Sequence, residues 1–168
     1  AGGRYFAYNL LSEIDMQEEY YLDRTNGLLY FYPAEGFADS EITFSLLTEP
    51  VISMKGATNV VVRDLSIEAS RGSGVSMDEN CSNNAIFNCT IKNLAGNAAL
   101  IDGKNNGVDS CTIYHTDGGV TVNGGDVQTL AHAENYVQNC DIYEFARIRK
   151  TYNAAVQFNG VGNRASKN

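Results

Sequence analysis

The sequence contains no tryptophan, and its 12 lysine and arginine residues are outnumbered by 20 aspartate and glutamate residues. The resulting formal net charge of -8 argues against a nucleic-acid partner, because binding to phosphates depends on clustered basic residues. No apolar run approaches the roughly 18 residues of a membrane-spanning helix, so we expect no membrane span. The chain also has no nucleophile elbow, phosphate-binding loop, zinc-protease motif or dinucleotide fingerprint, so nothing in it demands a cofactor.

Helical periodicity is missing as well, because the apolar residues of the segment 51–168 recur at every second position. That segment instead repeats one phrase about five times, and the clearest copy runs from Ile101 to Ile113. The isoleucine that ends the phrase occurs at positions 67, 91, 113 and 142, at spacings of 24, 22 and 29 residues. A unit of about 20–50 residues cannot bury its apolar face alone, so successive units must stack.

These repeats predict an all-β fold, a right-handed parallel β-helix (a solenoid) of about five turns. Its turns would be residues 51–69, 71–94, 95–116, 117–145 and 146–168. The first alternation of each turn supplies an inward pair, giving Ile52/Met54, Val75/Met77, Ala99/Ile101, Val120/Val122 and Val156/Phe158. The second supplies inward triplets, giving Val62/Leu65/Ile67, Ile86/Cys89/Ile91, Val108/Cys111/Ile113 and Val137/Cys140/Ile142. Asn- and Gly-rich corners should separate the strands; they contain Gly96, Asn97, Asn105, Asn106, Gly107, Gly118, Gly119, Gly124 and Gly125. The alternatives are a β-sandwich or a jelly roll, whose hairpins would not give fixed inward columns.

Three of the four cysteines, Cys89, Cys111 and Cys140, fall in one inward column of successive turns. A buried free cysteine packs as a small apolar side chain, and we expect that role here. A disulfide within the column, or one that includes Cys81, is the alternative. Metal binding is disfavoured because no paired CxxC and no nearby histidine accompany the cysteines.

Residues 1–50 form a lead-in that we expect to cover or extend the start of the solenoid, which then occupies residues 51–168. Within it, Asn26-Gly27 separates two short apolar runs and predicts a β-hairpin. No capping element follows the last turn at Asn168, and an uncapped solenoid exposes strand edges and apolar side chains. We therefore expect the C-terminal edge to meet further turns of the same protein or another chain.

Several phrases resemble the right-handed parallel β-helix proteins of the pectin-lyase-like superfamily, especially its carbohydrate-active members. They are Glu19–Pro33, Gly124-Gly-Asp126, Asn135-Tyr-Val-x-Asn139, and Tyr152 followed by Gly160-Val-Gly-Asn163. The resemblance implies a secreted protein that acts on or binds a polysaccharide or other glycan. It does not fix a reaction, because polysaccharide lyases, glycoside hydrolases, epimerases and non-catalytic adhesins share this fold. Two N-glycosylation patterns, which begin at Asn80 and Asn88, agree weakly with secretion.

The candidate catalytic residues are Asp78, Asp102 and Asp126. Asp78 and Asp102 follow equivalent strands, so their outward side chains would stand on adjacent rungs, roughly 5 Å apart. Such a pair suits the nucleophile and acid/base of a retaining glycosidase, or hard oxygen ligation of Ca²⁺. Asp126 is the best match to a family position. For all three, capping of turns is the simpler interpretation.

The candidate substrate-binding residues are Asn123, Arg147, Arg149, Tyr152 and Asn159. Asn123 and Asn159 continue the outward column, and the basic residues could meet a uronate carboxylate. The net negative charge favours a neutral glycan and hydrolysis along an outward groove. Two other functions remain open, namely a non-catalytic solenoid module for glycan binding, adhesion or assembly, and a Ca²⁺-dependent polysaccharide lyase. Whether the aspartates line one groove or cap turns with backbone amides should discriminate between them.

Overall fold

The computed structural model describes residues 7–168, which separate into one compact unit ending at Ile42 and a second from Thr43 to Asn168. The first unit contains η1 (Leu11–Glu13), β1 (Tyr20–Asp23), β2 (Leu28–Phe31) and η2 (Phe37–Asp39). Strands β1 and β2 pair antiparallel, which confirms the predicted hairpin. The Asp23 carboxylate accepts hydrogen bonds from the amides of Thr25 and Asn26 and thereby shapes its turn.

The first unit has no core of its own, because no residue from 7 to 42 is buried. Its order comes from local contacts. The Asn9 side chain bonds both the backbone N–H and the C=O of Leu22, at 2.8 and 3.1 Å. Across the hairpin, the rings of Tyr21 and Tyr30 lie 5.9 Å apart. Tyrosines and leucines on this unit therefore remain open to solvent.

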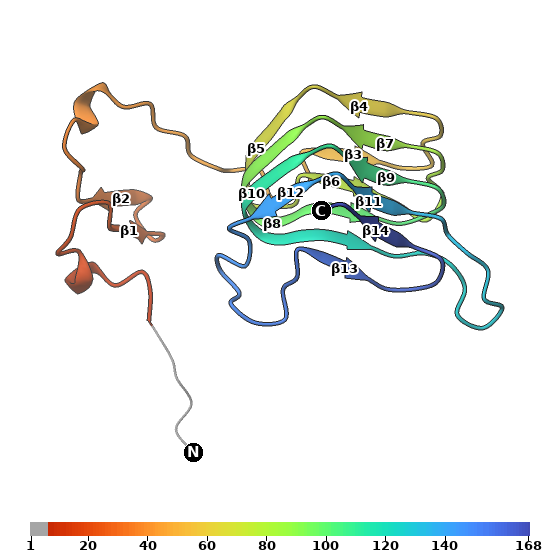
Figure 1. The fold of residues 1–168 in the computed structure, drawn as a ribbon. Coiled ribbons are helices and arrows are strands. Elements are labelled where there is room, and N and C mark those ends of the chain that lie inside the picture. The colour runs from red at the N-terminus through yellow and green to blue at the C-terminus, as the bar shows by residue number, and fades with distance from the viewer. Residues whose placement is uncertain (1–6) are drawn as a thin grey trace, which may run out of the picture. The chain divides into compact units, whose positions relative to one another are not determined.

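The second unit is a coil of parallel strands (Figure 1). Two sheets run along it, one in the order β12-β10-β8-β6-β3 with β13 and β5 attached, the other in the order β14-β11-β9-β7-β4. The strands are β3 (Ile52–Met54), β4 (Val61–Arg63), β5 (Ser66–Ser70), β6 (Val75–Met77), β7 (Ala85–Phe87), β8 (Thr90–Ile101), β9 (Gly107–Asp109), β10 (Thr112–Val122), β11 (Tyr136–Gln138), β12 (Asp141–Tyr143), β13 (Val156–Phe158) and β14 (Arg164–Ser166). Every pairing in these two sheets is parallel, which confirms the β-helix and contradicts the sandwich alternative.

The corners of the coil follow a rule that the apolar pattern did not reveal. Each of the first four turns has three residues with positive φ, five positions apart: 59, 64 and 69; 83, 88 and 93; 105, 110 and 115; 134, 139 and 144. Asparagine fills six of these twelve positions, because its short polar side chain tolerates the left-handed region better than most. A three-residue strand fits between two such corners.

The predicted corners at Gly96, Asn97, Gly118 and Gly119 were wrong, since these residues lie inside β8 and β10. The backbone of the neighbouring turn passes so close there that a side chain does not fit. A Cβ at Gly96 would lie 2.7 Å from the backbone of Gly72, and one at Gly119 would overlap the Ala155 carbonyl. These glycines serve close stacking rather than chain reversal.

The core consists of the predicted inward columns. In the middle turns Val75, Met77, Ala99, Ile101 and Val120 are fully buried. Exceptions occur where a turn has a neighbour on one side only: Leu65, predicted to point inward, is 50% exposed, and Phe158 is 40% exposed. Both ends of the coil therefore present apolar side chains.

All four cysteines are free and buried. The thiol column works as a hydrogen-bond ladder: Cys111 Sγ accepts the backbone N–H of Cys89 at 3.4 Å, and each thiol lies near a carbonyl of its own corner. In the last turn, Asn168 Oδ1 takes the same role toward the N–H of Cys140 at 2.9 Å. The hydrogen bond with Cys140, together with burial, raises the pKa of the Cys111 thiol.

A second ladder, which the sequence analysis missed, consists of the buried Asn84, Asn106 and Asn135. Asn106 Oδ1 accepts hydrogen bonds from the backbone N–H and the side-chain amide of Asn84, both at 2.9 Å. Its Nδ2 donates to the carbonyls of Cys81 and Asp102 at 3.0 and 2.8 Å. This ladder satisfies backbone groups at the corner where no strand partner is available.

Candidate functional site

The predicted outward column exists at the end of the first strand of each turn. Strand register places Asp78 after Met77 and Asp102 after Ile101, on adjacent rungs. Further along the column, Asn159 Nδ2 donates to Asn123 Oδ1 at 2.9 Å. The column brings together four of the predicted site residues, so its chemistry depends on what each carboxylate already binds.

Asp78 caps a turn. Its Oδ1 accepts the backbone N–H of Gly56 at 3.0 Å and that of Asn80 at 3.1 Å. The hydrogen bond from Gly56, with smaller contributions that include the one from Asn80, lowers the pKa of Asp78. Asp78 is therefore a fixed, ionised carboxylate at neutral pH and not a proton donor.

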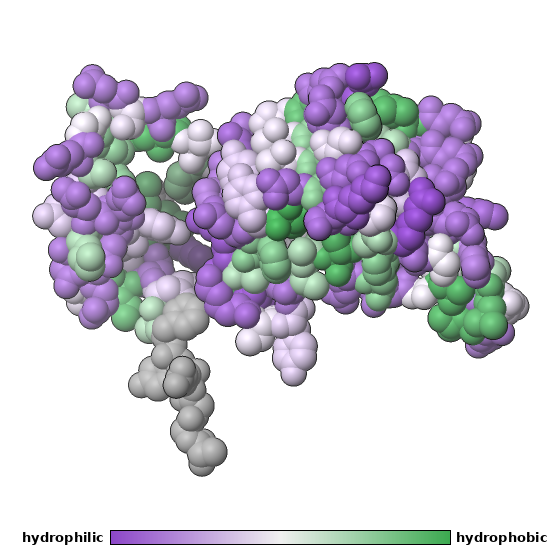
Figure 2. Space-filling model, viewed as in Figure 1, coloured by the Kyte–Doolittle hydropathy of each residue, from purple (hydrophilic) through white to green (hydrophobic). Residues whose placement is uncertain are grey.

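Asp126 caps a different turn, in the loop from Gly124 to Glu134 that precedes β11. Its Oδ1 accepts the backbone N–H of Gln128 at 2.7 Å and that of Thr129 at 3.2 Å. These bonds lower the pKa of Asp126, the one from Gln128 most. Figure 2 shows a hydrophobic tip on this loop, where Val127 and Leu130 are each 67% exposed. Asp126 organises that tip.

Asp102 differs from both, because its half-buried carboxylate makes no side-chain hydrogen bond to any residue from 7 to 168. Its backbone carbonyl accepts Asn106 Nδ2 instead, at 2.8 Å. Of the three aspartates proposed for catalysis, Asp102 alone keeps its carboxylate free for a ligand.

The basic loop from Ala146 to Tyr152, between β12 and β13, is anchored by Asp117. This carboxylate, 3% exposed, accepts the amides of Ile148 and Arg149 at 2.9 and 2.7 Å, and Arg149 Nε at 2.6 Å. Its position before Gly118-Gly119 predicts a turn residue, and the structure shows that Asp117 also holds this loop. Arg149, expected to bind substrate, uses Nε for this ion pair although its side chain is 64% exposed. Arg147 and Tyr152 are exposed as well.

The Asp117 anchor should make stability depend on pH. Burial would raise the pKa of Asp117, but hydrogen bonds from Arg149 and Ile148 outweigh it and lower the pKa. A lowered folded-state pKa stabilises the fold above the unfolded value of about 3.9, and this contribution disappears as pH falls through the folded pKa. We expect Asp117→Asn to lose about 2 kcal/mol of unfolding free energy at pH 7, and less at pH 3, measured by urea denaturation. An equal loss at both pH values would contradict an ionised anchor.

The solenoid also has a polar groove of about 540 Å³, which we term the amide groove, along one row of corners. Its lining consists of Ser82, Asn83, Lys104, Asn105 and Glu134. Three of these residues have the positive φ of equivalent corners in successive turns, namely 56° at Asn83, 53° at Asn105 and 60° at Glu134. Stacking of the turns therefore builds the groove from residues far apart in the sequence.

Hydrogen-bonding capacity remains open in the amide groove. Asn105 Nδ2 donates to Asn83 Oδ1 at 2.8 Å. This bond leaves the side-chain N–H groups of Asn83 and Oδ1 of Asn105 available to a ligand. Glu134 shares one oxygen with His132 Nδ1 at 3.2 Å, and Lys104 forms no ion pair within residues 7–168. Three successive turns thus contribute amide, ammonium and carboxylate groups to the groove. The sequence analysis assigned Asn105 to a corner but missed the groove; the five-residue spacing of corners was the signal that could have found it.

The fold, the outward column and the amide groove together define a right-handed parallel β-helix whose polar side chains form columns along its walls. Comparison with protein families agrees: residues 50–165 match the family described as the right handed beta helix region, and the chain belongs to that family. The superfamily suggested by the sequence is consistent with this match. No match was found among curated proteins or among solved structures. Within residues 7–168, none of the helices has the length and apolar character needed to cross a bilayer.

Proposed function

We propose that this β-helix is a non-catalytic, extracellular glycan-binding module that holds its ligand in the amide groove. The observation that carries the proposal is the capture of Asp78 and Asp126 by backbone amides, together with a separate groove lined by amide, ammonium and carboxylate groups. A sugar hydroxyl both donates and accepts, so a lining of amide, ammonium and carboxylate groups suits it. The mixture of Lys104 and Glu134 favours a neutral glycan.

Hydrolysis, the function first expected from sequence, needs a carboxylic acid that is protonated near neutral pH, which requires a raised pKa. The pKa shifts of Asp78 and Asp126 go in the opposite direction. The free carboxylate of Asp102 supports hydrolysis as the second candidate, with Asp102 as the base.

The calcium-dependent lyase has less support. Hard oxygen ligands must converge on Ca²⁺, and it takes six to eight of them. Among residues 7–168, no three histidine, cysteine, aspartate or glutamate side chains are placed to hold a metal ion. The lyase alternative therefore lacks a preformed carboxylate cluster within the described part of the chain.

Glycan-array binding followed by calorimetry on the best ligand tests the proposal. We expect Asn83→Ala/Lys104→Ala to weaken binding at least tenfold. Asn59→Ala/Lys55→Ala is the matched control, because Asn59 has the same corner conformation in the first turn, φ 58° against 56°, but does not line the groove. The control should bind as the wild type does. Equal binding by all three proteins would remove the amide groove as the site.

A reducing-end assay on the bound glycan separates binding from hydrolysis. The proposal predicts no release of reducing ends by the wild type or by Asp102→Asn. Release by the wild type that is lost in Asp102→Asn would replace the binding module with the hydrolase.

A further inference from the structure

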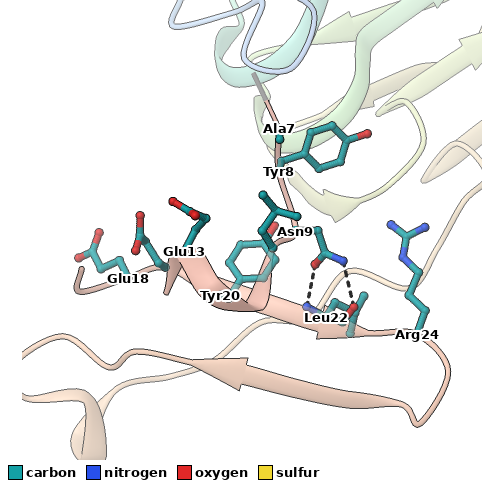
Figure 3. A pocket seen from close by; sticks show the side chains of 10 residues that line it. Ala7, Tyr8, Asn9, Glu13, Glu18, Tyr20, Leu22 and Arg24 are labelled. Atoms are coloured by element: carbon teal, nitrogen blue, oxygen red, sulfur yellow. Dashed lines mark hydrogen bonds between the residues drawn. The ribbon is translucent and has the colours of Figure 1, made fainter. Parts of the chain in front are cut away.

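The N-terminal unit has a hollow of about 490 Å³ (Figure 3). Its lining combines carboxylates and aromatic or aliphatic side chains with one guanidinium: Ala7, Tyr8, Asn9, Leu10, Glu13, Glu18, Glu19, Tyr20, Leu22 and Arg24. Figure 3 shows Glu13 and Glu18 at one end and Arg24 at the other, with the Asn9–Leu22 clamp between them. Glu19 is committed to the backbone amides of Asp15 and Met16, at 3.0 and 2.9 Å.

This unit is strongly acidic as well as apolar. Residues 7–42 contain eight aspartates and glutamates against Arg24 alone, a formal charge of -7. They also expose Tyr20 by 63%, Leu28 by 50% and Tyr32 by 44%. An exposed surface that is both acidic and apolar fits a partner with the opposite charge and its own apolar groups.

The basic loop of the solenoid has that chemistry. Between Phe145 and Tyr152 it carries Arg147, Arg149 and Lys150 and no acidic residue, a formal charge of +3. Ile148 is 60% exposed and Tyr152 fully exposed. Because Asp117 bonds two backbone amides and the Arg149 guanidinium, the loop is held in shape before it binds, which reduces the entropic cost of docking.

We propose that the basic loop of one copy docks on the acidic N-terminal unit of a second copy, so that the chains associate head to tail. The two surfaces differ, so the contact is heterologous, and each copy keeps one free surface of each kind. Association then extends beyond a dimer as concentration rises. Long-range attraction between the charges makes it weaken with salt.

Mixing two variants tests the proposal, because each variant keeps the surface that is altered in the other. Arg147→Glu/Lys150→Glu changes the formal charge of the loop from +3 to -1 and leaves the Arg149–Asp117 pair intact. Glu13→Lys/Glu18→Lys reduces the formal charge of residues 7–42 from -7 to -3 and leaves Glu19 in place. Sedimentation velocity in 20 mM salt should show concentration-dependent association of the wild type, and each variant alone should need at least tenfold more protein to associate. An equimolar mixture should form a heterodimer and stop there, because only the unchanged loop of one variant (+3) and the unchanged acidic unit of the other (-7) are complementary, whereas the two altered surfaces (-1 and -3) are not.

Lys55→Glu/Arg71→Glu is the control for the loop variant, because both change the net charge by -4. The control should associate as the wild type does. A monomeric wild type at all concentrations would overturn the proposal, and so would variants that associate unchanged. If the reversed loop instead abolishes only binding of an acidic glycan, the loop is a ligand surface and not a self-association surface. The result of this test does not depend on whether the amide groove binds a glycan.

Discussion

Replacing Asn106 by alanine should lower the free energy of unfolding by about 4 kcal/mol, since four side-chain hydrogen bonds are lost at about 1 kcal/mol each. Asn106 is fully buried, and its side chain links two turns, because it bonds Asn84 and Cys81 of the preceding turn and Asp102 of its own. Removal of its amide leaves donors and acceptors without partners where water does not enter. Urea denaturation of both proteins at pH 7 measures the difference.

Asn105→Ala is the matched control for this prediction. Asn105 is the preceding residue, is exposed, and makes one side-chain hydrogen bond, to Asn83. We expect that variant to lose no more than about 1 kcal/mol, including the strain of a left-handed alanine. Similar losses in the two variants would mean that the buried ladder does not hold the turns together.

The second large effect is expected at Gly103, where φ is +79°. A Cβ there would overlap the carbonyl oxygen of Cys81 in the neighbouring turn. Gly103→Ala therefore combines left-handed strain with a backbone clash, and should cost about 3 kcal/mol or more. Thermal and urea unfolding should both register it.

Gly56→Ala distinguishes the left-handed strain from the backbone clash. Gly56 also has positive φ, +58°, but nothing lies within 4 Å of the Cβ position. Strain alone should cost about 1 kcal/mol there. If Gly103→Ala proves no worse than Gly56→Ala, the neighbouring turns are not packed as closely as described.

The fold was predictable because its core repeats in the sequence. Columns such as Val75, Ala99 and Val120 stand at equivalent places in a repeated phrase, and each fills the same inward position. The recurrence of apolar residues at equivalent places in the repeat predicted the parallel stacking. Leu65 broke the pattern because burial also needs a neighbouring turn on both sides, which the first turn lacks.

The polar features were harder to predict from the sequence than the core. Asn84, Asn105 and Asn106 look alike in the sequence, yet one step along the chain moves a side chain from the buried ladder to the outer groove. Asp117 resembled a turn residue because its partner, Arg149, lies 32 residues later in a loop of irregular length. Such pairings depend on loop conformation, which an apolar repeat does not encode.

Adjacency of the turns, on which both the groove and the ladders depend, can be measured by disulfide trapping. Thr90 of β8 and Thr112 of β10 are paired residues on neighbouring parallel strands, whose separation is about 4.8 Å. Mild oxidation of Thr90→Cys/Thr112→Cys should link them within one chain, because bridging tolerates Cα separations up to about 7 Å. In Thr90→Cys/Tyr114→Cys the pair is offset by two residues, and no link should form. Rapid linking of the offset pair, with none of the paired one, would contradict the stacked coil.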